Sequence, residues 1–326
     1  MRINPSSMSP WFVPDQAQAP RLAFRDWGRP DGEVWLSLHG GPGSGAGPSQ
    51  WAPFDATRHR VIVPDQRGAG RSRPRGRCRG NNLNALIADL EVLRKRLGIE
   101  RWHVLGGSWG ATLAVAYAAR HPKAVGRLVL RGVFDAHPKT VSALFEAQPR
   151  HPGARLNKSR RGPALWHRLL QLLHFGAVDA QQQHAISAWA TCERQGLLRG
   201  LQRGLRDARA ASLHAAMRRQ RRALSAQASR PSTTQLRAQR DTLRIQAHYF
   251  AHRCFLPPGA WTRATRALAQ HPWPIDVVHG RHDLVCPVRL ARAWVAQVPQ
   301  ARLHLTRAGH LGQETDNLRQ LRACVA

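Results

Sequence analysis

The stretch Arg101-Trp-His-Val-Leu-Gly-Gly-Ser-Trp-Gly110 carries the pentapeptide G-x-S-x-G directly after a short apolar run. Residues 101–105 predict a strand, and residues 111–120 predict a helix that ends at His121-Pro122. A strand, a turn flanked by glycines and a helix form the setting in which this pentapeptide exposes a serine hydroxyl. The sequence therefore predicts Ser108 as a nucleophile at the end of a strand.

Strand and helix patterns continue in both directions from this stretch. Apolar runs predict further strands at residues 33–38, 60–64, 275–280 and 302–306, and another that begins at Leu128. Apolar residues at three- and four-residue spacing predict helices at 83–97 and 289–298. Strands that alternate with helices are typical of a parallel sheet covered on both faces. The predicted fold class is α/β, with a mostly parallel central sheet.

The segment from residue 140 to 270 differs in character from the rest of the chain. Strand patterns are missing from it, and Leu, Ala, Gln and Arg dominate its composition. It also carries more than half of the chain's excess of basic residues. We expect a catalytic core formed by residues 1–139 and 271–326, with residues 140–270 inserted as a helical cap.

A serine hydroxyl needs a base to take its proton and an acid to orient that base. Asp283 and His310 directly follow the last two predicted strands, so both are expected at the sheet edge where Ser108 lies. The chain order is then serine, acid, histidine, as this kind of sheet requires. Asp135 and Asp65, which follow earlier strands, are the competing candidates for the acid.

A tetrahedral intermediate needs two hydrogen-bond donors for its oxyanion. One is the backbone N–H of Trp109, the residue after the predicted nucleophile. The other is expected from the loop His39-Gly-Gly-Pro-Gly43, with the Gly41 N–H as the favoured donor. A phosphate cradle is the alternative for this loop, but neither G-K-[ST] nor G-x-G-x-x-G spacing is present. His39 leads this loop and is disfavoured as the base.

The chain is strongly basic, because 50 Lys and Arg against 19 Asp and Glu give a formal net charge of +31, and arginine supplies most of the positive charge. Such a balance occurs in proteins that bind nucleic acid or anionic surfaces. Here, however, arginine is spread along the chain, and no helix-turn-helix, zinc-finger or RNA-recognition signature accompanies it. We therefore expect a solvated, Arg-rich surface and no specific nucleic-acid partner.

The five cysteines are scattered and odd in number, and they form neither a disulfide framework nor a paired metal motif. The sequence also lacks H-E-x-x-H, so no metal site is predicted and no cofactor is implied. No apolar run approaches the ~18 residues of a membrane helix, and the first residues lack the apolar segment of a secretory signal. We expect a cytoplasmic protein without a membrane partner; self-association is left open.

Six motifs, in the same order along the chain, resemble those of the proline iminopeptidases, which are serine aminopeptidases of the α/β-hydrolase fold. They are His39-Gly-Gly-Pro-Gly43, Asp65-Gln-Arg-Gly-Ala-Gly-Arg-Ser72, Gly106-Gly-Ser-Trp-Gly110, Leu130-Arg-Gly-Val-Phe134, His248-Tyr-Phe250, and His279-Gly-Arg-His-Asp283 with Cys286-Pro287. The resemblance covers nearly the whole chain. It implies an α/β-hydrolase core with a cap, and release of an N-terminal residue, ideally proline, from a short peptide through an acyl-enzyme.

The resemblance also implies residues that hold the substrate. In the family, cap glutamates bind the protonated α-amine, and Glu193 falls on one such position. The second position is Gln246, where the family usually has Glu, so one charge-assisted contact is replaced by a neutral one. Arg131, Phe134 and Cys286 match positions that line the proline pocket, although ordinary packing at strand ends also accounts for such residues.

Three hypotheses follow from the sequence. The leading one is a serine aminopeptidase that releases N-terminal residues, preferentially proline, from short peptides. The second keeps the same machinery but makes it an esterase or amidase that acts on a non-cationic small substrate, which Gln246 and the basic cap favour. The third is a basic nucleic-acid-binding protein with vestigial catalysis.

Overall fold

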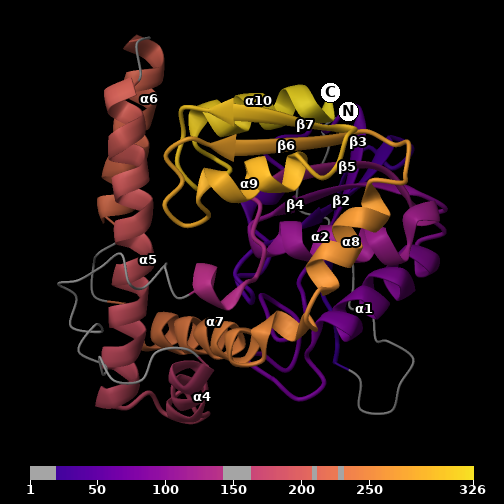
Figure 1. The fold of residues 1–326 in the computed structure, drawn as a ribbon. Coiled ribbons are helices and arrows are strands. Elements are labelled where there is room, and N and C mark those ends of the chain that lie inside the picture. Colours follow the sequence, from indigo (N-terminus) through magenta and orange to yellow (C-terminus); the bar gives the residue numbers. More distant parts are fainter. Residues whose placement is uncertain (1–19, 142–162, 208–210, 227–230) are drawn as a thin grey trace.

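The computed structural model describes residues 20–141, 163–207, 211–226 and 231–326 (Figure 1). A seven-stranded sheet with the order β1-β3-β2-β4-β5-β6-β7 forms its centre. The strands are β1 (Phe24–Gly28), β2 (Glu33–Leu38), β3 (His59–Pro64), β4 (Trp102–Gly107), β5 (Val125–Arg131), β6 (Ile275–Gly280) and β7 (Ala301–Thr306). β1 is antiparallel to β3, and every other neighbouring pair is parallel. The α/β class and the mostly parallel sheet are confirmed.

Helices cover both faces of the sheet because its side chains alternate between two buried layers. One layer packs with α1 (Leu83–Arg96), α2 (Trp109–Arg120), α8 (Ala260–Leu268) and α9 (Val288–Val295). The other packs with α10 (Thr315–Val325). Within β3, for example, Ile62 belongs to the first layer and Val61 and Val63 to the second, and none of the three is exposed. This continuous burial explains the unbroken apolar runs in the sequence.

Two elements of the core were not predicted. β1 has the sequence Phe-Arg-Asp-Trp-Gly, and its charged Asp26 pairs with Arg60 of β3 at 2.7 Å, so it lacks the apolar run of a central strand. α10 closes the second face through Leu321, Cys324 and Val325. Its three- and four-residue spacing was present in the sequence and would have predicted this helix.

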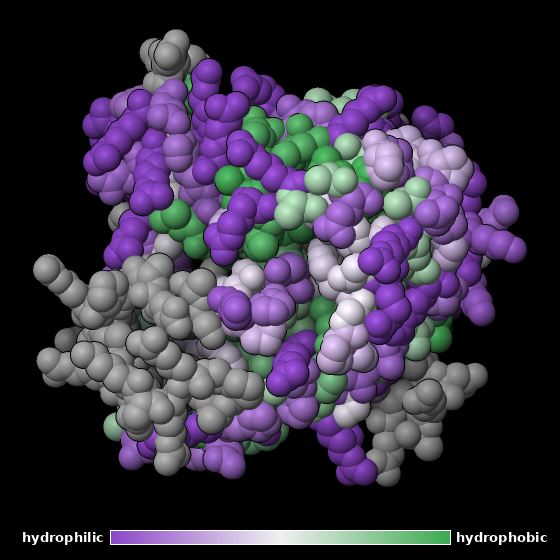
Figure 2. All heavy atoms as spheres, viewed as in Figure 1, coloured by the Kyte–Doolittle hydropathy of each residue, from purple (hydrophilic) through white to green (hydrophobic). Residues whose placement is uncertain are grey.

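Between β5 and α8, the described residues contain four further α-helices. They are α4 (Pro163–Leu172), α5 (Ala180–Asp207), α6 (Ala211–Ala226) and α7 (Thr233–Ala251). α4 packs on α7, and α5 lies beside α6 as a long pair at the edge of the molecule (Figure 1). In the space-filling view, hydrophilic side chains cover the region of this pair (Figure 2).

The division into a core and a cap stays a prediction at its boundaries. Residues 142–162 and two shorter stretches of the expected cap lie outside the described residues. At the C-terminal end of the expected cap, α8 packs on α2, which lies directly against the sheet. This contact groups α8 with the core layer, although the sequence analysis placed it in the last part of the cap.

No helix in the described residues is long and apolar enough to cross a membrane.

Candidate active site

The tight turn between β4 and α2 exposes the side chain of Ser108. Ser108 has φ 56° and ψ −121°, a sparsely populated conformation for a residue with a side chain. The turn depends on its glycines, since a Cβ at Gly106 would lie 2.2 Å from the Gly110 carbonyl oxygen. A hydrogen bond of 2.8 Å from the Ser108 N–H to the Arg131 carbonyl oxygen ties the turn to β5. Strain of this kind is typical of a functional position.

Asp283 and His310, predicted from the ends of β6 and β7, form a buried hydrogen-bonded pair. His310 Nδ1 lies 2.8 Å from Asp283 Oδ2. The other carboxylate oxygen accepts hydrogen bonds from the backbone N–H groups of Val285 at 2.8 Å and Cys286 at 2.7 Å. Burial opposes ionisation of Asp283, but the facing His310 and these hydrogen bonds outweigh it and lower its pKa. The carboxylate therefore stays ionised and can orient the imidazole.

The competing acids occupy other places. Asp65 uses both carboxylate oxygens to accept hydrogen bonds from the backbone of Ala46 and Arg71, and Asp135 accepts one from the His137 N–H. Each of these contacts shapes a loop. Among the described hydrogen bonds, the one that joins an acid to His310 comes from Asp283.

The loop after β2 brings Gly41, one of the two predicted oxyanion donors, to the cavity that Ser108 lines, and the other donor, Trp109, directly follows Ser108. His39 is buried, and the Gln66 N–H donates to its Nε2 at 3.1 Å, so its proton lies on Nδ1 and bonds the Gly40 carbonyl oxygen at 2.9 Å. Burial lowers the pKa of His39, which keeps it neutral in this role. In a trans peptide the Gly41 N–H points away from that carbonyl. Within the described residues, neither the Gly41 nor the Trp109 N–H has a hydrogen-bond acceptor.

Gln66 joins the two sides of this predicted oxyanion hole. Its Oε1 accepts a hydrogen bond of 2.9 Å from the Trp109 indole, and its Nε2 donates one of 2.9 Å to the His39 carbonyl oxygen. The side chain is buried, so both ends of its amide are used. Gln66 was quoted in a motif but not predicted to have a role.

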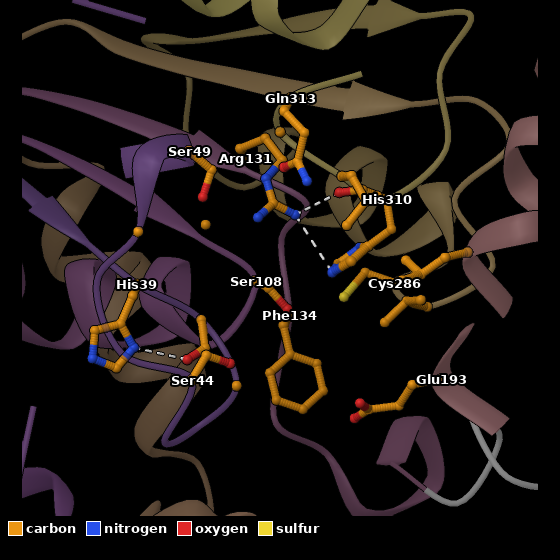
Figure 3. Close-up of a pocket in the computed structure, with 18 of the residues that line it drawn as sticks. His39, Ser44, Ser49, Ser108, Arg131, Phe134, Glu193, Cys286, His310 and Gln313 are labelled. Atoms are coloured by element: carbon orange, nitrogen blue, oxygen red, sulfur yellow. Dashed lines mark hydrogen bonds between the residues drawn. The ribbon is translucent and has the colours of Figure 1, made fainter. Parts of the chain in front are cut away.

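Around Ser108, the side chains of Arg131, His310 and Cys286 converge (Figure 3). Arg131 donates a hydrogen bond of 2.7 Å to the His310 carbonyl oxygen, and its Nη1 lies 3.4 Å from His310 Nε2. The Ser108 hydroxyl lies beside the Cys286 thiol, whose pKa is raised well above its usual range, chiefly by burial. No hydrogen bond between Ser108 and His310 is present in the described part of the chain. A rotation of the Ser108 side chain between staggered rotamers would be needed to bring the hydroxyl to Nε2.

Glu314 supports the loop that carries His310. Its carboxylate accepts hydrogen bonds from the N–H groups of Gly309 at 2.7 Å and Leu311 at 2.8 Å, on either side of the histidine. Burial raises the pKa of Glu314 to about 7, against the effect of the two hydrogen bonds. The sequence analysis missed this residue, although an acid four positions after the predicted base was a usable signal.

A cavity of about 670 Å³ brings together most of the predicted site residues. Its lining includes Gly41, Ser108, Arg131, Phe134, Glu193, Gln246, Cys286 and His310. Phe134 is fixed from behind, since its carbonyl oxygen accepts a hydrogen bond of 2.6 Å from Thr112. Asp283 lies behind His310, and Trp109 is fully buried below Ser108, where its indole packs on Tyr249.

At one end of this cavity, Glu193 and Gln246 lie together. Glu193 is exposed to solvent on the side where it lines the cavity. The protein atoms packed around its carboxylate displace water, and this desolvation raises its pKa. Hydrogen bonds from the Trp189 indole, at 3.0 Å, and from the Gln246 amide act in the opposite direction. The Gln246 Oε1 is buried without a hydrogen-bond partner in the described residues. A carboxylate beside an unpaired acceptor is the arrangement that an ammonium group needs.

Two sets of side chains hold possible metal ligands within 4.8 Å of one another: Asp283, Cys286 and His310, and Asp276, His304 and Cys324. In each set the carboxylate already bonds its histidine at 2.8 Å. A guanidinium group also lies beside each set, Arg131 at His310 and Arg127 at 3.2 Å from Asp276. These contacts are those of hydrogen-bonded ion pairs.

Comparison with known proteins places the chain in a family. The model of the alpha/beta hydrolase fold matches residues 36–317. Proline iminopeptidases from Neisseria meningitidis serogroup B and Xylella fastidiosa are 32% and 34% identical to this chain, over 89% and 91% of its length and 86% and 90% of theirs. The chain belongs to the proline iminopeptidase family of α/β hydrolases. The resemblance predicted from the motifs is thereby confirmed.

A likeness at the level of the fold extends to more distant hydrolases. A probable hydrolytic enzyme from Pseudomonas aeruginosa superposes on this α/β hydrolase with a TM-score of 0.62 at 19% identity, over 98% of this chain and 95% of the other. This superposition supports the α/β-hydrolase architecture, but at such low identity it carries no information on the substrate.

Proposed function

We propose that this α/β hydrolase is a serine aminopeptidase that releases N-terminal residues, preferentially proline, from short peptides. Its relatives are named proline iminopeptidases. The observation that carries the proposal is the single cavity shared by Ser108, His310 and Glu193, since it joins a nucleophile and base to an anionic group for a substrate amine.

In the proposed reaction, Ser108 Oγ attacks the carbonyl carbon of the N-terminal residue. His310 Nε2 accepts the hydroxyl proton and then delivers it to the leaving amine, while Asp283 holds the imidazole through Nδ1. The N–H groups of Gly41 and Trp109 donate hydrogen bonds to the carbonyl oxygen as negative charge develops on it. Water then releases the acyl group from Ser108 with the same base, so that the enzyme is restored.

The substrate amine is assigned to the end of the cavity formed by Glu193 and the unpaired Oε1 of Gln246. Phe134 and Cys286 supply apolar surface between that end and Ser108, where a pyrrolidine ring would pack. Because Gln246 carries no charge and burial raises the pKa of Glu193, this amine site is weaker than one with two ionised carboxylates.

The test is hydrolysis of prolyl-naphthylamide beside alanyl-naphthylamide and a simple ester. We expect the prolyl substrate to be preferred, and Ser108→Ala to lower turnover by several orders of magnitude. Glu193→Gln should lower kcat/KM for the cationic substrates and leave ester hydrolysis nearly unchanged. An intact fold without prolyl or other aminoacyl activity would reject the substrate assignment.

A second candidate is an esterase or amidase that acts on a non-cationic small substrate. The neutral Gln246 and the raised pKa of Glu193 favour it, because both weaken attraction for an ammonium group. Ester turnover that exceeds peptide turnover and does not respond to Glu193→Gln would support this candidate.

We also propose a cytoplasmic location, with a small peptide as the partner and neither nucleic acid nor membrane as a ligand. All five cysteines are free, and four of them are buried, which suits a reducing compartment. Retention of the protein on DNA or on anionic vesicles at physiological salt would contradict the partner proposal.

A further inference from the structure

The helix α5 lines the cavity with residues between Cys192 and Arg203. Glu193 lies at the middle of this helix, and Arg199 and Arg203, closer to its C-terminal end, also line the cavity. Ten residues of α-helix separate Glu193 from Arg203, which corresponds to about 15 Å along the axis. The cavity therefore has a carboxylate toward one end and guanidinium groups toward the other.

The arginine end of α5 is held firmly against the core. A Cβ at Gly200 would lie 2.8 Å from the His282 carbonyl oxygen, and one at Gly204 would lie 2.4 Å from the Arg307 carbonyl oxygen. Such close approach of backbones is possible because both residues are glycines. Arg203 is thus positioned beside the loop that carries His310.

No carboxylate pairs with Arg203 in the described part of the chain. The acidic residue one turn later, Asp207, is bonded to His282 at 2.5 Å. Arg203 is exposed and lines the cavity, so its charge is free to meet an anionic group that enters there. A guanidinium group binds a carboxylate through two parallel hydrogen bonds.

We propose that Arg203 forms a subsite for the C-terminal carboxylate of a di- or tripeptide. The proposal rests on the proposed aminopeptidase function, since it places the substrate amine at Glu193. Two or three extended residues span about 7 to 11 Å. The long arginine side chain extends from its helix position into the cavity and can cover the difference to the 15 Å between helix positions. The substrate class is then short peptides with a free C-terminus.

The net charge of +31 supports this preference, because a cationic protein attracts the anionic end of a peptide. Substrates without a C-terminal carboxylate, such as peptide amides, would lose the contact with Arg203 and keep the contact with Glu193. The two classes of substrate are thus distinguished by the far end of the cavity and not by the reacting bond.

The experiment compares kcat/KM for Pro-Ala and Pro-Ala-Ala with kcat/KM for their C-terminal amides. We expect the free acids to be favoured about ten-fold in the unmodified enzyme, mainly through KM, and the preference to shrink as salt is added. Arg203→Gln should bring the ratio of acid to amide near one, whereas Arg203→Lys should keep part of it. Arg206→Gln is the matched control, because Arg206 is exposed on the same helix outside the cavity lining and should retain the full ratio.

Hydrolysis of prolyl-naphthylamide separates this proposal from the proposed function. A ratio near one in the unmodified enzyme, or a ratio unaffected by Arg203→Gln, overturns the carboxylate subsite while naphthylamide hydrolysis still supports the aminopeptidase. If the naphthylamide is not hydrolysed, the carboxylate subsite is tested by calorimetry, which measures the affinity of the Ser108→Ala variant for Pro-Ala and for Pro-Ala amide. Equal affinity for both ligands overturns the subsite, and tighter binding of the acid supports it.

Discussion

His310 Nδ1 and Asp283 Oδ2 are 2.8 Å apart, and the second oxygen of Asp283 is held by two backbone N–H groups. The carboxylate therefore has a fixed orientation and dictates which nitrogen of His310 carries the proton. Gly132, in the turn after β5, backs this pair, since a Cβ there would lie 3.4 Å from the imidazole and 3.5 Å from the carboxylate.

Asp283→Asn is expected to lower kcat about 10³- to 10⁴-fold, because an amide N–H facing Nδ1 would favour the wrong tautomer of His310. The measurement is steady-state hydrolysis of prolyl-naphthylamide. Asp135→Asn is the matched control: it removes the competing acid and should leave kcat within a few-fold. A larger loss in the control than in Asp283→Asn would reverse the assignment of the acid.

Gln246→Glu tests the amine site directly. A second carboxylate beside Glu193 should improve kcat/KM for prolyl-naphthylamide by roughly ten-fold above neutral pH, because a charge-assisted contact replaces a neutral one. At lower pH the gain should fade, since two adjacent carboxylates share a proton. Ester hydrolysis serves as the reference; if peptide turnover fails to improve while ester turnover holds, the amine-site argument is wrong.

Gln66→Met should reduce kcat with little change in KM. The variant removes the bridge between the Trp109 indole and the His39 carbonyl oxygen, so the two predicted oxyanion donors would lose their mutual alignment. We expect a loss of about 10- to 100-fold, measured at saturating substrate. Gln297→Met, on the exposed side of the core, is the comparison variant. A rise in KM alone would show that Gln66 affects substrate binding instead.

Glu314 should make stability depend on pH. Its pKa is raised to about 7 by burial, from a usual value near 4.5, so the folded protein binds the proton more tightly than the unfolded chain. The resulting stability is fully present below pH 4.5 and is lost as pH rises through about 7. The loss is on the order of 3 kcal/mol in the free energy of unfolding.

Urea unfolding at pH 5, 6, 7 and 8 compares the unmodified protein with Glu314→Gln. The variant lacks this titration, so its free energy of unfolding should decline less over the same interval. Parallel curves for the two proteins would contradict the assignment of the titration to Glu314.

Gly204→Ala should lower Tm, against the usual gain of about 1 kcal/mol when alanine replaces glycine within a helix. The added Cβ would lie 2.4 Å from the Arg307 carbonyl oxygen and 2.6 Å from Met217 Cε, so α5 would be displaced from the core. Gly196→Ala is the control on the same helix. Its Cβ would meet Val285 Cγ2 at 3.8 Å, an ordinary contact, and its Tm should rise. Equal shifts in both variants would contradict close packing at Gly204.

The predicted strands and helices of the core agree with the structure in most places because their signals are local. The strand at residues 275–280 has the predicted bounds, and the predicted helix at 83–97 is observed as Leu83–Arg96. The predicted and observed bounds differ where the apolar pattern of a strand is interrupted. β5 begins at Val125, three residues before the predicted start, since half-buried Gly126 and Arg127 interrupt its apolar pattern. The edge strand β1 was missed for a related reason, because one of its sides has no neighbouring strand among the described residues.

The sequence by itself determined the α/β core and the order of Ser108, Asp283 and His310, because parallel strands carry their loops to one edge wherever the intervening chain runs. It also determined the family, through motifs that are each a short continuous stretch of the chain. The tertiary structure decided which acid meets His310, the bridge by Gln66, the support from Glu314 and the placement of Arg203 in the cavity. All but the support from Glu314 depend on contacts between segments far apart in the sequence, and a buried hydrogen bond or a close backbone approach leaves no periodic pattern from which it can be predicted. The contacts of Glu314 are local, with Gly309 and Leu311.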